Sequence, residues 1–333
     1  MTGLLFGVGT RVPDVARECP IVVYRPATLV VVPSIVANSG FVEGDCVMNV
    51  WQIGDVKITR VVEMEMTGGS KFILPDATRD ACKPYEWMSP HFMDAEGNLI
   101  MSVHALVVDT GDHRIVVDTC IGNDKQRSIP TWTNLQTSFL QDLEAAGYPR
   151  ESIDMVMCTH LHVDHVGWNT MLVDGEWVPT FPNARYLMAE KEWNYWDAAE
   201  DDKVYGPVLA DSVRPIVEAG LADFVSDTYE LCPQVQLEPT PGHTPGHVSV
   251  HITSNGEEAL ITGDCIHHPV QMTRTDWCSS ADYDQAQGRS TRESLLDKYV
   301  DGDVLIIGTH FATPTAGHVK HLEGGGYWLD VNA

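Results

Sequence analysis

Short apolar runs, separated by turn residues, make up most of the pattern of hydrophobic and polar positions along the chain. Several alternate with period two or are rich in β-branched residues, which is typical of β-strands. Pairs such as Asn255-Gly256 between neighbouring runs favour tight hairpins. The expected strands and strand pairs cover residues 50–64, 102–109, 113–119, 153–158, 170–182, 184–189, 235–239, 248–253, 259–262 and 304–307.

A second kind of segment has apolar residues at helical spacing. The pattern predicts helices over 134–146, around Trp193 and Trp196, over 208–219 and over 291–300. Ser290 and Glu293 have the spacing of a capping box, so the last of these helices should begin at 291. The mixture of strands and helices indicates an α/β fold with two β-sheets packed face to face and helices outside.

Potential metal ligands cluster directly after one buried run. Thr159 is followed by His160, His162, Asp164 and His165, four imidazole or carboxylate groups within six positions. Such nitrogen and oxygen donors suit zinc and similar divalent cations. In an extended backbone, His160 and His162 would point the same way.

Further candidate ligands follow three other apolar runs. They are His243, Asp264 and His310, each close to the end of an expected strand. In sheets flanked by helices, functional sites gather beyond strand ends. We therefore expect four distant segments to meet at one place. Asp118, also at a strand end, is expected to support the site rather than to bind a metal.

The chain is long enough for one large domain, and the pattern shows no internal repeat or Gly/Ser linker. We expect one domain over 46–333 and an irregular N-terminal arm over 1–45. No run is long and apolar enough to cross a membrane. The aromatic loop at 85–93 could be a pocket wall or a loop pinned to the core.

Composition narrows the choice of substrate and compartment. The chain has 21 Lys and Arg against 47 Asp and Glu, a formal net charge of −26. Such a surface repels nucleic acid and anionic membranes and favours neutral or cationic small molecules. The 8 cysteines are scattered and form no C-x-x-C pair, which favours free thiols in the cytoplasm. Secreted and periplasmic locations stay open.

The order of these motifs resembles the metallo-β-lactamase fold superfamily. The resemblance rests on the H-x-H-x-D-H run at 160–165, the Gly242–His247 segment, Gly263-Asp264 and the late His310, and it covers roughly 50–320. It implies a four-layer αββα sandwich of two mixed β-sheets flanked by helices, with two metals at one edge of the sheets. It also implies that His160, His162 and His243 hold one metal, that Asp164, His165 and His310 hold the other, and that Asp264 bridges them.

Within this superfamily the pattern is most similar to the branch of N-acyl-homoserine lactonases, pyridoxolactonase and methyl-parathion-type hydrolases. The resemblance implies a dinuclear hydrolase in which a metal-bound hydroxide attacks the carbonyl of an uncharged lactone or carboxylic ester. Zn²⁺ is the expected metal, with Mn²⁺, Co²⁺ or Fe²⁺ as alternatives. Asp164 is the expected proton carrier, and a homodimer is an open alternative to a monomer.

One residue departs from the lactonase pattern. Homoserine lactonases carry a tyrosine three positions after the bridging aspartate, where this chain has His267. Histidine can also donate a hydrogen bond, so we expect His267 to take part in catalysis beside Asp164 and Asp264. Phosphotriester, β-lactam and thioester hydrolysis remain alternatives, as does an iron-dependent redox enzyme of the same fold.

Overall fold

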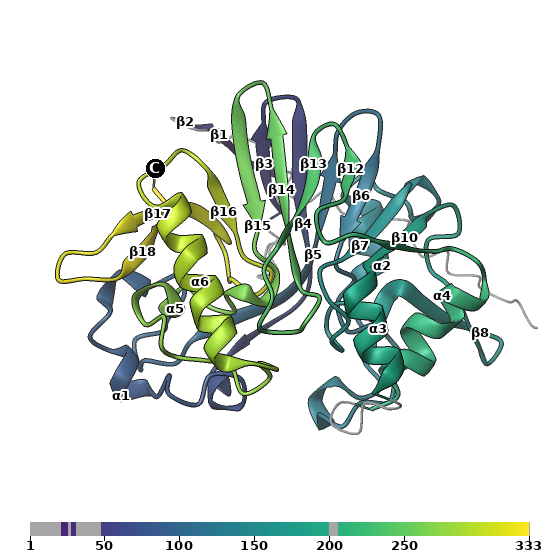
Figure 1. The fold of residues 1–333 in the computed structure, drawn as a ribbon, viewed down its shortest axis with the longest axis horizontal. Coiled ribbons are helices and arrows are strands. Elements are labelled where there is room, and N and C mark those ends of the chain that lie inside the picture. Colours follow the sequence, from purple (N-terminus) through teal and green to yellow (C-terminus); the bar gives the residue numbers. More distant parts are fainter. Residues whose placement is uncertain (1–20, 26–27, 31–47, 200–205, 333) are drawn as a thin grey trace, which may run out of the picture.

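The computed structural model describes residues 21–25, 28–30, 48–199 and 206–332. Their strands form two large sheets that lie face to face with helices on the outside (Figure 1). This is the mixed α/β sandwich that the sequence predicts. No described helix has the length and apolarity that a membrane span requires.

The first sheet holds nine of the described strands, in the order β11-β10-β7-β6-β5-β4-β3-β1-β2. Neighbours β7, β10 and β11 run parallel, whereas β3, β4, β5 and β6 form an antiparallel meander. The bounds are β1 Ile21–Arg25, β2 Thr28–Val30, β3 Met48–Ile53, β4 Val56–Thr67, β5 Ile100–Asp109, β6 Arg114–Val117, β7 Met155–Cys158, β10 Arg185–Ala189 and β11 Ala222–Val225.

The second sheet holds seven of the described strands in sequence order, from β12 to β18. Only β15 and β16 pair in parallel, and helix α6 makes the connection between them. The bounds are β12 Glu230–Cys232, β13 Val235–Pro239, β14 Val248–Ser254, β15 Glu257–Ile261, β16 Leu305–Ile307, β17 Ala316–His321 and β18 Tyr327–Asp330. A separate hairpin joins β8 Thr170–Val173 to β9 Glu176–Pro179.

Helices cover both outer faces. Their bounds are α1 Arg79–Cys82, α2 Phe139–Ala145, α3 Glu190–Ala198, α4 Arg214–Glu218, α5 Val270–Thr273 and α6 Gln285–Tyr299. Shorter turns are η1 Ser70–Phe72, η2 Glu86–Met88, η3 Pro130–Trp132, η4 Arg150–Ser152, η5 Gly167–Asn169, the π-turn η6 Leu209–Val213 and η7 Gly263–Cys265.

Three apolar layers hold the sandwich together. The central layer joins the facing sides of the two sheets, for example Ile58 and Val108 of the first sheet with Val250 and Ile261 of the second. Helices α2 and α4 bury their apolar faces on the first sheet, and α6 buries Leu295 and Leu296 on the second. Burial of this kind is the main favourable contribution to folding.

The model corrects three expectations about individual segments. The helix expected over 134–146 begins only at Phe139, because Asn134 takes a left-handed conformation with φ 53° and its backbone N–H donates to Lys125 O. The last helix begins at Gln285 rather than 291. Within 1–45, expected to be irregular, β1 and β2 are strands that extend the first sheet beyond β3.

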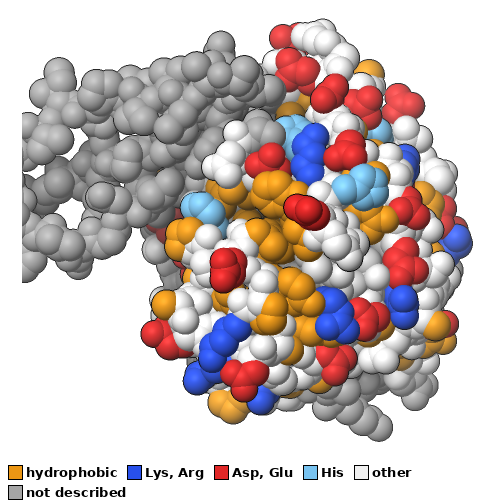
Figure 2. Space-filling view, turned by 90° about the vertical axis from the view of Figure 1, so that its left-hand side faces the viewer, with side chains coloured by type: hydrophobic (Ala, Val, Ile, Leu, Met, Phe, Trp, Pro, Cys, Tyr) orange, Lys and Arg blue, Asp and Glu red, His pale blue; other side chains and the backbone are white. Residues whose placement is uncertain are grey.

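The remainder of the 1–45 arm lies outside the described residues. The single domain over 46–333 stays a prediction. The aromatic loop at 85–93 is held to the core, since its own Met88 and Phe92 are buried in the apolar cluster that also contains Leu295 and Leu296. The outer face that carries β17 and β18 shows acidic side chains scattered among basic and apolar ones rather than gathered into one patch (Figure 2).

Candidate metal centre

The loop after β7 brings the first group of candidate ligands to the edge of the first sheet. Its start is anchored by Asp118, whose carboxylate accepts hydrogen bonds from the backbone N–H and the hydroxyl of Thr159. The loop then turns, and His165 N–H donates to His162 O at 3.1 Å. Position 167 requires glycine, because the Ile121 carbonyl leaves no room for a side chain: a Cβ at 167 would lie 1.8 Å from that oxygen.

The second sheet supplies the other three candidates from the ends of its strands. His243 follows β13, Asp264 lies in η7 directly after β15, and His310 follows β16. The two sheets are tied at this edge, because Ser102 N–H of β5 donates to His310 O at 3.0 Å. All four strand ends therefore meet at one place, as the sequence predicts.

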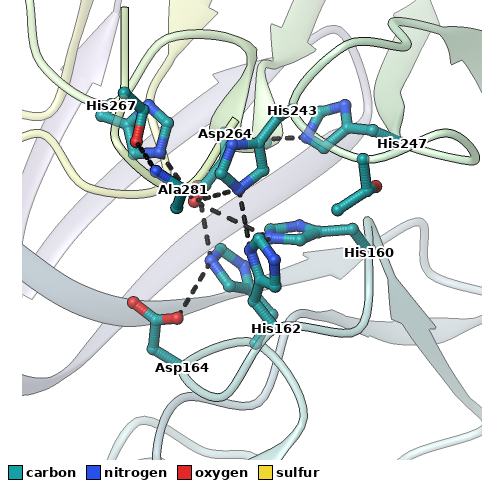
Figure 3. A network of polar contacts seen from close by, with 12 residues as sticks. His160, His162, Asp164, His243, His247, Asp264, His267 and Ala281 are labelled. Atoms are coloured by element: carbon teal, nitrogen blue, oxygen red, sulfur yellow. Dashed lines mark hydrogen bonds and ion pairs between the residues drawn. The ribbon is translucent and has the colours of Figure 1, made fainter. Parts of the chain in front are cut away.

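Three imidazoles converge on one side of Asp264. His162 Nδ1 lies 3.0 Å from His160 Nε2 and 2.8 Å from His243 Nε2. Asp264 Oδ2 lies 3.3 Å from His243 Nε2 and 3.7 Å from His160 Nε2. Figure 3 shows these rings turned toward one another around the carboxylate. One nitrogen from each ring and one Asp264 oxygen all lie within 4.8 Å of one another.

The second group surrounds the other oxygen of the same carboxylate. Asp264 Oδ1 lies 3.3 Å from His165 Nε2 and 3.2 Å from His310 Nε2. These two nitrogens are 3.2 Å apart, and Asp164 approaches them at 3.7 and 3.5 Å. Each oxygen of Asp264 thus faces a different group of donors, which is the geometry that a bridging carboxylate requires.

Hydrogen bonds on the outer ring nitrogens decide which nitrogens are free to bind a cation. His165 Nδ1 donates to Asp118 and His243 Nδ1 donates to Asp282, both at 2.8 Å, and His310 Nδ1 donates to Ser102 O at 2.9 Å. In its neutral form each of these rings keeps its one proton on Nδ1 and presents a bare Nε2 to the centre.

This donor set fits divalent cations. In the neutral rings His165 Nε2 and His310 Nε2 would both be acceptors, yet they lie 3.2 Å apart with only carboxylates beside them. On the other side, a single proton on His162 Nδ1 could satisfy only one of its two close neighbours. Facing lone pairs in a buried site are unfavourable unless a cation lies between them. Imidazole nitrogens with carboxylate oxygens are the ligands expected for zinc.

The local charges agree with this arrangement. Burial, followed by the neighbouring imidazoles, holds the pKa of His160 and His162 well below the usual histidine value. Burial opposes the charged form of Asp264, but His165, His310 and His267 outweigh it and hold the pKa of this carboxyl well below its usual range. Burial also opposes the charged form of His165, His243 and His310, but Asp264 and neighbouring carboxylates outweigh it and raise the pKa of these rings, that of His243 to about 9. A cation bound among these rings would take the place of the protons that they otherwise carry.

His267 lies beside the two groups without belonging to either. Its Nε2 is 3.3 Å from Asp264 Oδ2, and within the described residues neither ring nitrogen makes a hydrogen bond. The ring is 1% exposed. His267 lies close to Asp264 (Figure 3) and lines the cavity next to the centre. Its catalytic role stays a prediction.

The seven predicted ligands come together, and Asp118 supports them as expected. Sequence reasoning missed three supporting residues: Glu192 and Asp282 lie in segments with no motif of their own, and His247 lies in the Gly242–His247 motif but was given no role there. His247 accepts a hydrogen bond from Asp264 N–H at 2.8 Å, Asp282 orients His243, and Glu192 contacts both ligand loops. Burial lowers the pKa of His247 to about 3, so it stays a neutral acceptor.

A narrow cavity of about 90 Å³ opens above the centre. His162, Asp164, His243, Asp264, His267 and His310 line its floor. Its walls are largely apolar, with Met66, Phe72, Ile73, Met101, Val103, Trp132, Val163 and Ala281. No Lys or Arg of the described residues lines it.

Solved structures share this fold. A hydrolase described as AbOPH in the β-lactamase superfamily matches with a TM-score of 0.70 and 24% identity, covering 86% of this chain and 98% of that one. AidC, described as a dizinc quorum-quenching lactonase in complex with a product, matches with a TM-score of 0.69 and 19% identity, covering 86% and 97%.

Matches to curated relatives cover a smaller share of the chain. An N-acyl homoserine lactonase of Bacillus sp is 32% identical over 37% of this chain, and one of Bacillus cereus is 27% identical over 50%. The matches cover 42% and 66% of these two relatives, less than two thirds of either. A probable metallo-hydrolase of Mycobacterium bovis is 24% identical over 66% of this chain and 77% of its own length.

The family model described as the metallo-β-lactamase superfamily matches residues 100–310, which is more than half of the chain. This range includes all seven candidate ligands and the cavity floor. The chain belongs to the metallo-β-lactamase superfamily.

Proposed function

We propose that this protein is a dinuclear metal-dependent hydrolase that opens lactones or cleaves carboxylic esters. The observation that carries the proposal is the pair of donor groups on either side of Asp264, at the floor of an apolar cavity. His160, His162 and His243 would hold one cation, and Asp164, His165 and His310 the other, with Asp264 shared. Zn²⁺ suits this histidine-rich set, and Mn²⁺, Co²⁺ or Fe²⁺ are alternatives.

Two bound cations would supply a Lewis acid for the substrate carbonyl and a water acidic enough to ionise near neutral pH. The protein's own groups account for the remaining requirements. The apolar cavity walls accept an uncharged acyl or ring portion and keep water from the reacting carbonyl. Because no Lys or Arg of the described residues lines the cavity, an anionic substrate would find no ammonium or guanidinium group among them.

His267 is placed to contact the substrate. Burial lowers the pKa of its ring, so the imidazole is neutral and carries one N–H. Both ring nitrogens lack hydrogen bonds within the described residues, so that N–H is available to a carbonyl oxygen above Asp264. A donor fixed in this position stabilises negative charge that develops on the oxygen.

Asp164 is placed to carry a proton. Its carboxylate is 14% exposed, more than that of Asp264 at 4%, and it lines the same cavity. A carboxylate at the edge of the site could accept the proton that the attacking water loses and transfer it to the departing oxygen of a lactone or ester. The relatives named N-acyl homoserine lactonase favour a lactone among the uncharged candidates.

A substrate panel tests the proposal. Protein loaded in turn with zinc, manganese, cobalt or iron should hydrolyse lactones or aryl esters, with about two metals per chain measured by mass spectrometry. Asp264→Ala should lose activity and metal together, with an unchanged circular dichroism spectrum. Glu190→Gln, an exposed carboxylate on α3, should change neither.

Turnover of phosphotriesters alone would assign the site to phosphotriester hydrolysis. Turnover of β-lactams or thioesters alone would likewise replace the ester assignment. Full activity in Asp264→Ala, or wild-type protein that binds no metal under metal-replete conditions, would contradict the dinuclear site.

A further inference from the structure

A buried carboxylate outside the proposed ligand set joins the two ligand loops. Glu192 lies in the first turn of α3 and is 1% exposed. Its Oε1 accepts from Leu161 N–H at 3.1 Å and from Trp196 Nε1–H at 2.7 Å. Its Oε2 accepts from the Thr244 hydroxyl at 2.7 Å and from Gly246 N–H at 3.0 Å.

Every partner of Glu192 is a donor. Two are backbone N–H groups and one is an indole N–H, none of which can accept a hydrogen bond. The side chain must therefore present acceptors on both oxygens, which a carboxylate does. A glutamine of the same shape would turn its amide N–H₂ toward donors on one side and leave buried donors unpaired there.

Three of the four donors belong to the segments that carry three proposed ligands. Leu161 lies between His160 and His162, and Thr244 directly follows His243. The fourth donor, Trp196, also packs its ring edge-on against His162 with centroids 5.3 Å apart. Glu192 thus fixes the spacing of His160, His162 and His243 while contacting none of their rings through its own carboxylate.

The backbone around this contact leaves no space for a side chain at position 246. A Cβ on Gly246 would lie 2.2 Å from Glu192 N and 2.6 Å from Glu192 Cα. The His243 loop therefore packs directly against the start of α3, and only glycine permits it. This close approach brings Gly246 N–H within reach of the carboxylate.

The second group of proposed ligands, which contains His165 and His310, is held by other hydrogen bonds. His165 Nδ1 donates to Asp118 and His310 Nδ1 donates to Ser102 O. Neither anchor shares a hydrogen bond with Glu192 among the described residues. Asp118 also holds the Thr159 hydroxyl, which lies 3.1 Å from His160 Nδ1. Asp118 therefore supports both cation positions, whereas Glu192 supports only the position formed by His160, His162 and His243.

We infer that Glu192 is a positioning residue that sets the metal affinity of one of the two cation positions, the one formed by His160, His162 and His243. The inference rests on the proposed dinuclear site. Supporting groups that orient metal ligands change metal affinity by about 10- to 100-fold when they are replaced.

Zinc titration of wild-type protein and Glu192→Gln tests this inference. The variant should bind one zinc per chain with wild-type affinity and the second about 10- to 100-fold more weakly. Glu190→Gln, two positions earlier on the same helix and exposed, should bind both normally. Asp118→Asn should weaken both positions, because Asp118 contacts His165 and also the Thr159 hydroxyl beside His160. It is therefore the contrast to the loss at one position that is expected in Glu192→Gln.

Should Glu192→Gln fail to fold, Thr244→Val removes one of the four hydrogen bonds with little change in shape and should weaken the same position by a smaller factor. Equal loss at both positions, or two zincs bound with wild-type affinity by a folded Glu192→Gln, would overturn the inference alone. Wild-type protein without two zincs would instead overturn the proposed function.

Discussion

Two adjacent histidines show how strongly the surroundings of a residue decide its role. His267 has no hydrogen bond within the described residues and lies 3.3 Å from Asp264. His268 points away, and its Nε2 donates to Phe92 O at 2.9 Å while its Nδ1 accepts from Val270 N–H at 3.1 Å. A histidine therefore lines the cavity at position 267, and a histidine at position 268 anchors the core.

Replacing His267 should impair turnover rather than stability. His267→Phe removes the proposed donor to the substrate carbonyl and should lower kcat by about 10²-fold with little change in KM. Zinc content should stay the same, because His267 is not among the proposed ligands. Steady-state kinetics with a neutral ester, together with metal analysis, would check this. An unchanged kcat would remove His267 from catalysis.

His268 should make stability depend on pH. Burial lowers its pKa to about 4, from an ordinary value of 6.5. Between these values the unfolded chain binds a proton that the folded protein excludes, so stability falls as the pH decreases. From pH 7 to pH 5 this contribution amounts to about 2 kcal/mol.

Urea unfolding of wild-type protein and His268→Gln across this range would measure the contribution. The stability difference between the two should shrink by about 2 kcal/mol from pH 7 to pH 5. The same comparison with His321→Gln, whose side chain is 65% exposed, is the control. A difference that does not vary with pH would contradict the prediction.

Among the helices, α6 shows where a local signal is overridden. Ser290 and Glu293 have the spacing of a capping box, yet α6 begins at Gln285 and both residues lie inside it. The cap is Asp284, whose carboxylate accepts from Gln287 N–H at 3.0 Å. Its backbone N–H donates to Gly242 O at 2.9 Å, which ties the helix start to the His243 loop.

The stability of the helix should depend on Asp284 and not on Ser290. Asp284→Ala leaves the Gln287 N–H without its cap and should lower the free energy of unfolding by about 1 kcal/mol. Ser290→Ala, inside the helix, should change it by less than about 0.5 kcal/mol. Chemical denaturation of both variants would measure the difference, and the opposite ranking would restore the capping box as the helix start.

The whole molecule carries a formal net charge of −26. This charge acts on an approaching substrate at long range, whereas the apolar cavity walls act only on a substrate that contacts them. Anionic substrates should therefore approach more slowly than neutral ones, and salt should reduce this difference by screening.

A pair of esters with the same acyl chain, one neutral and one with an anionic leaving group, tests this effect. For the anionic ester kcat/KM should rise as the salt concentration increases, while for the neutral ester it should stay nearly constant. Equal salt dependence for both would show that the net charge does not act at the cavity.

The sequence by itself predicted the strands that lead to the candidate ligands, their hairpins and the identity of these ligands, whereas β1, β2, β11, β12, β17 and β18 were not predicted. These features are local: β-branched runs, Asn-Gly turns and four donor groups within residues 160–165 are all encoded over short distances. The strand ends at His243, Asp264 and His310 could be placed for the same reason, since each follows its own apolar run.

Only the tertiary structure decided which residues support those ligands. Glu192, His247 and Asp282 act through contacts with segments far away in the chain, and the sequence near each carries no signal for those partners. The true start of α6 also depends on a contact with Gly242. Local patterns specify elements because backbone geometry is local, whereas buried hydrogen-bond partners are chosen when distant elements pack together.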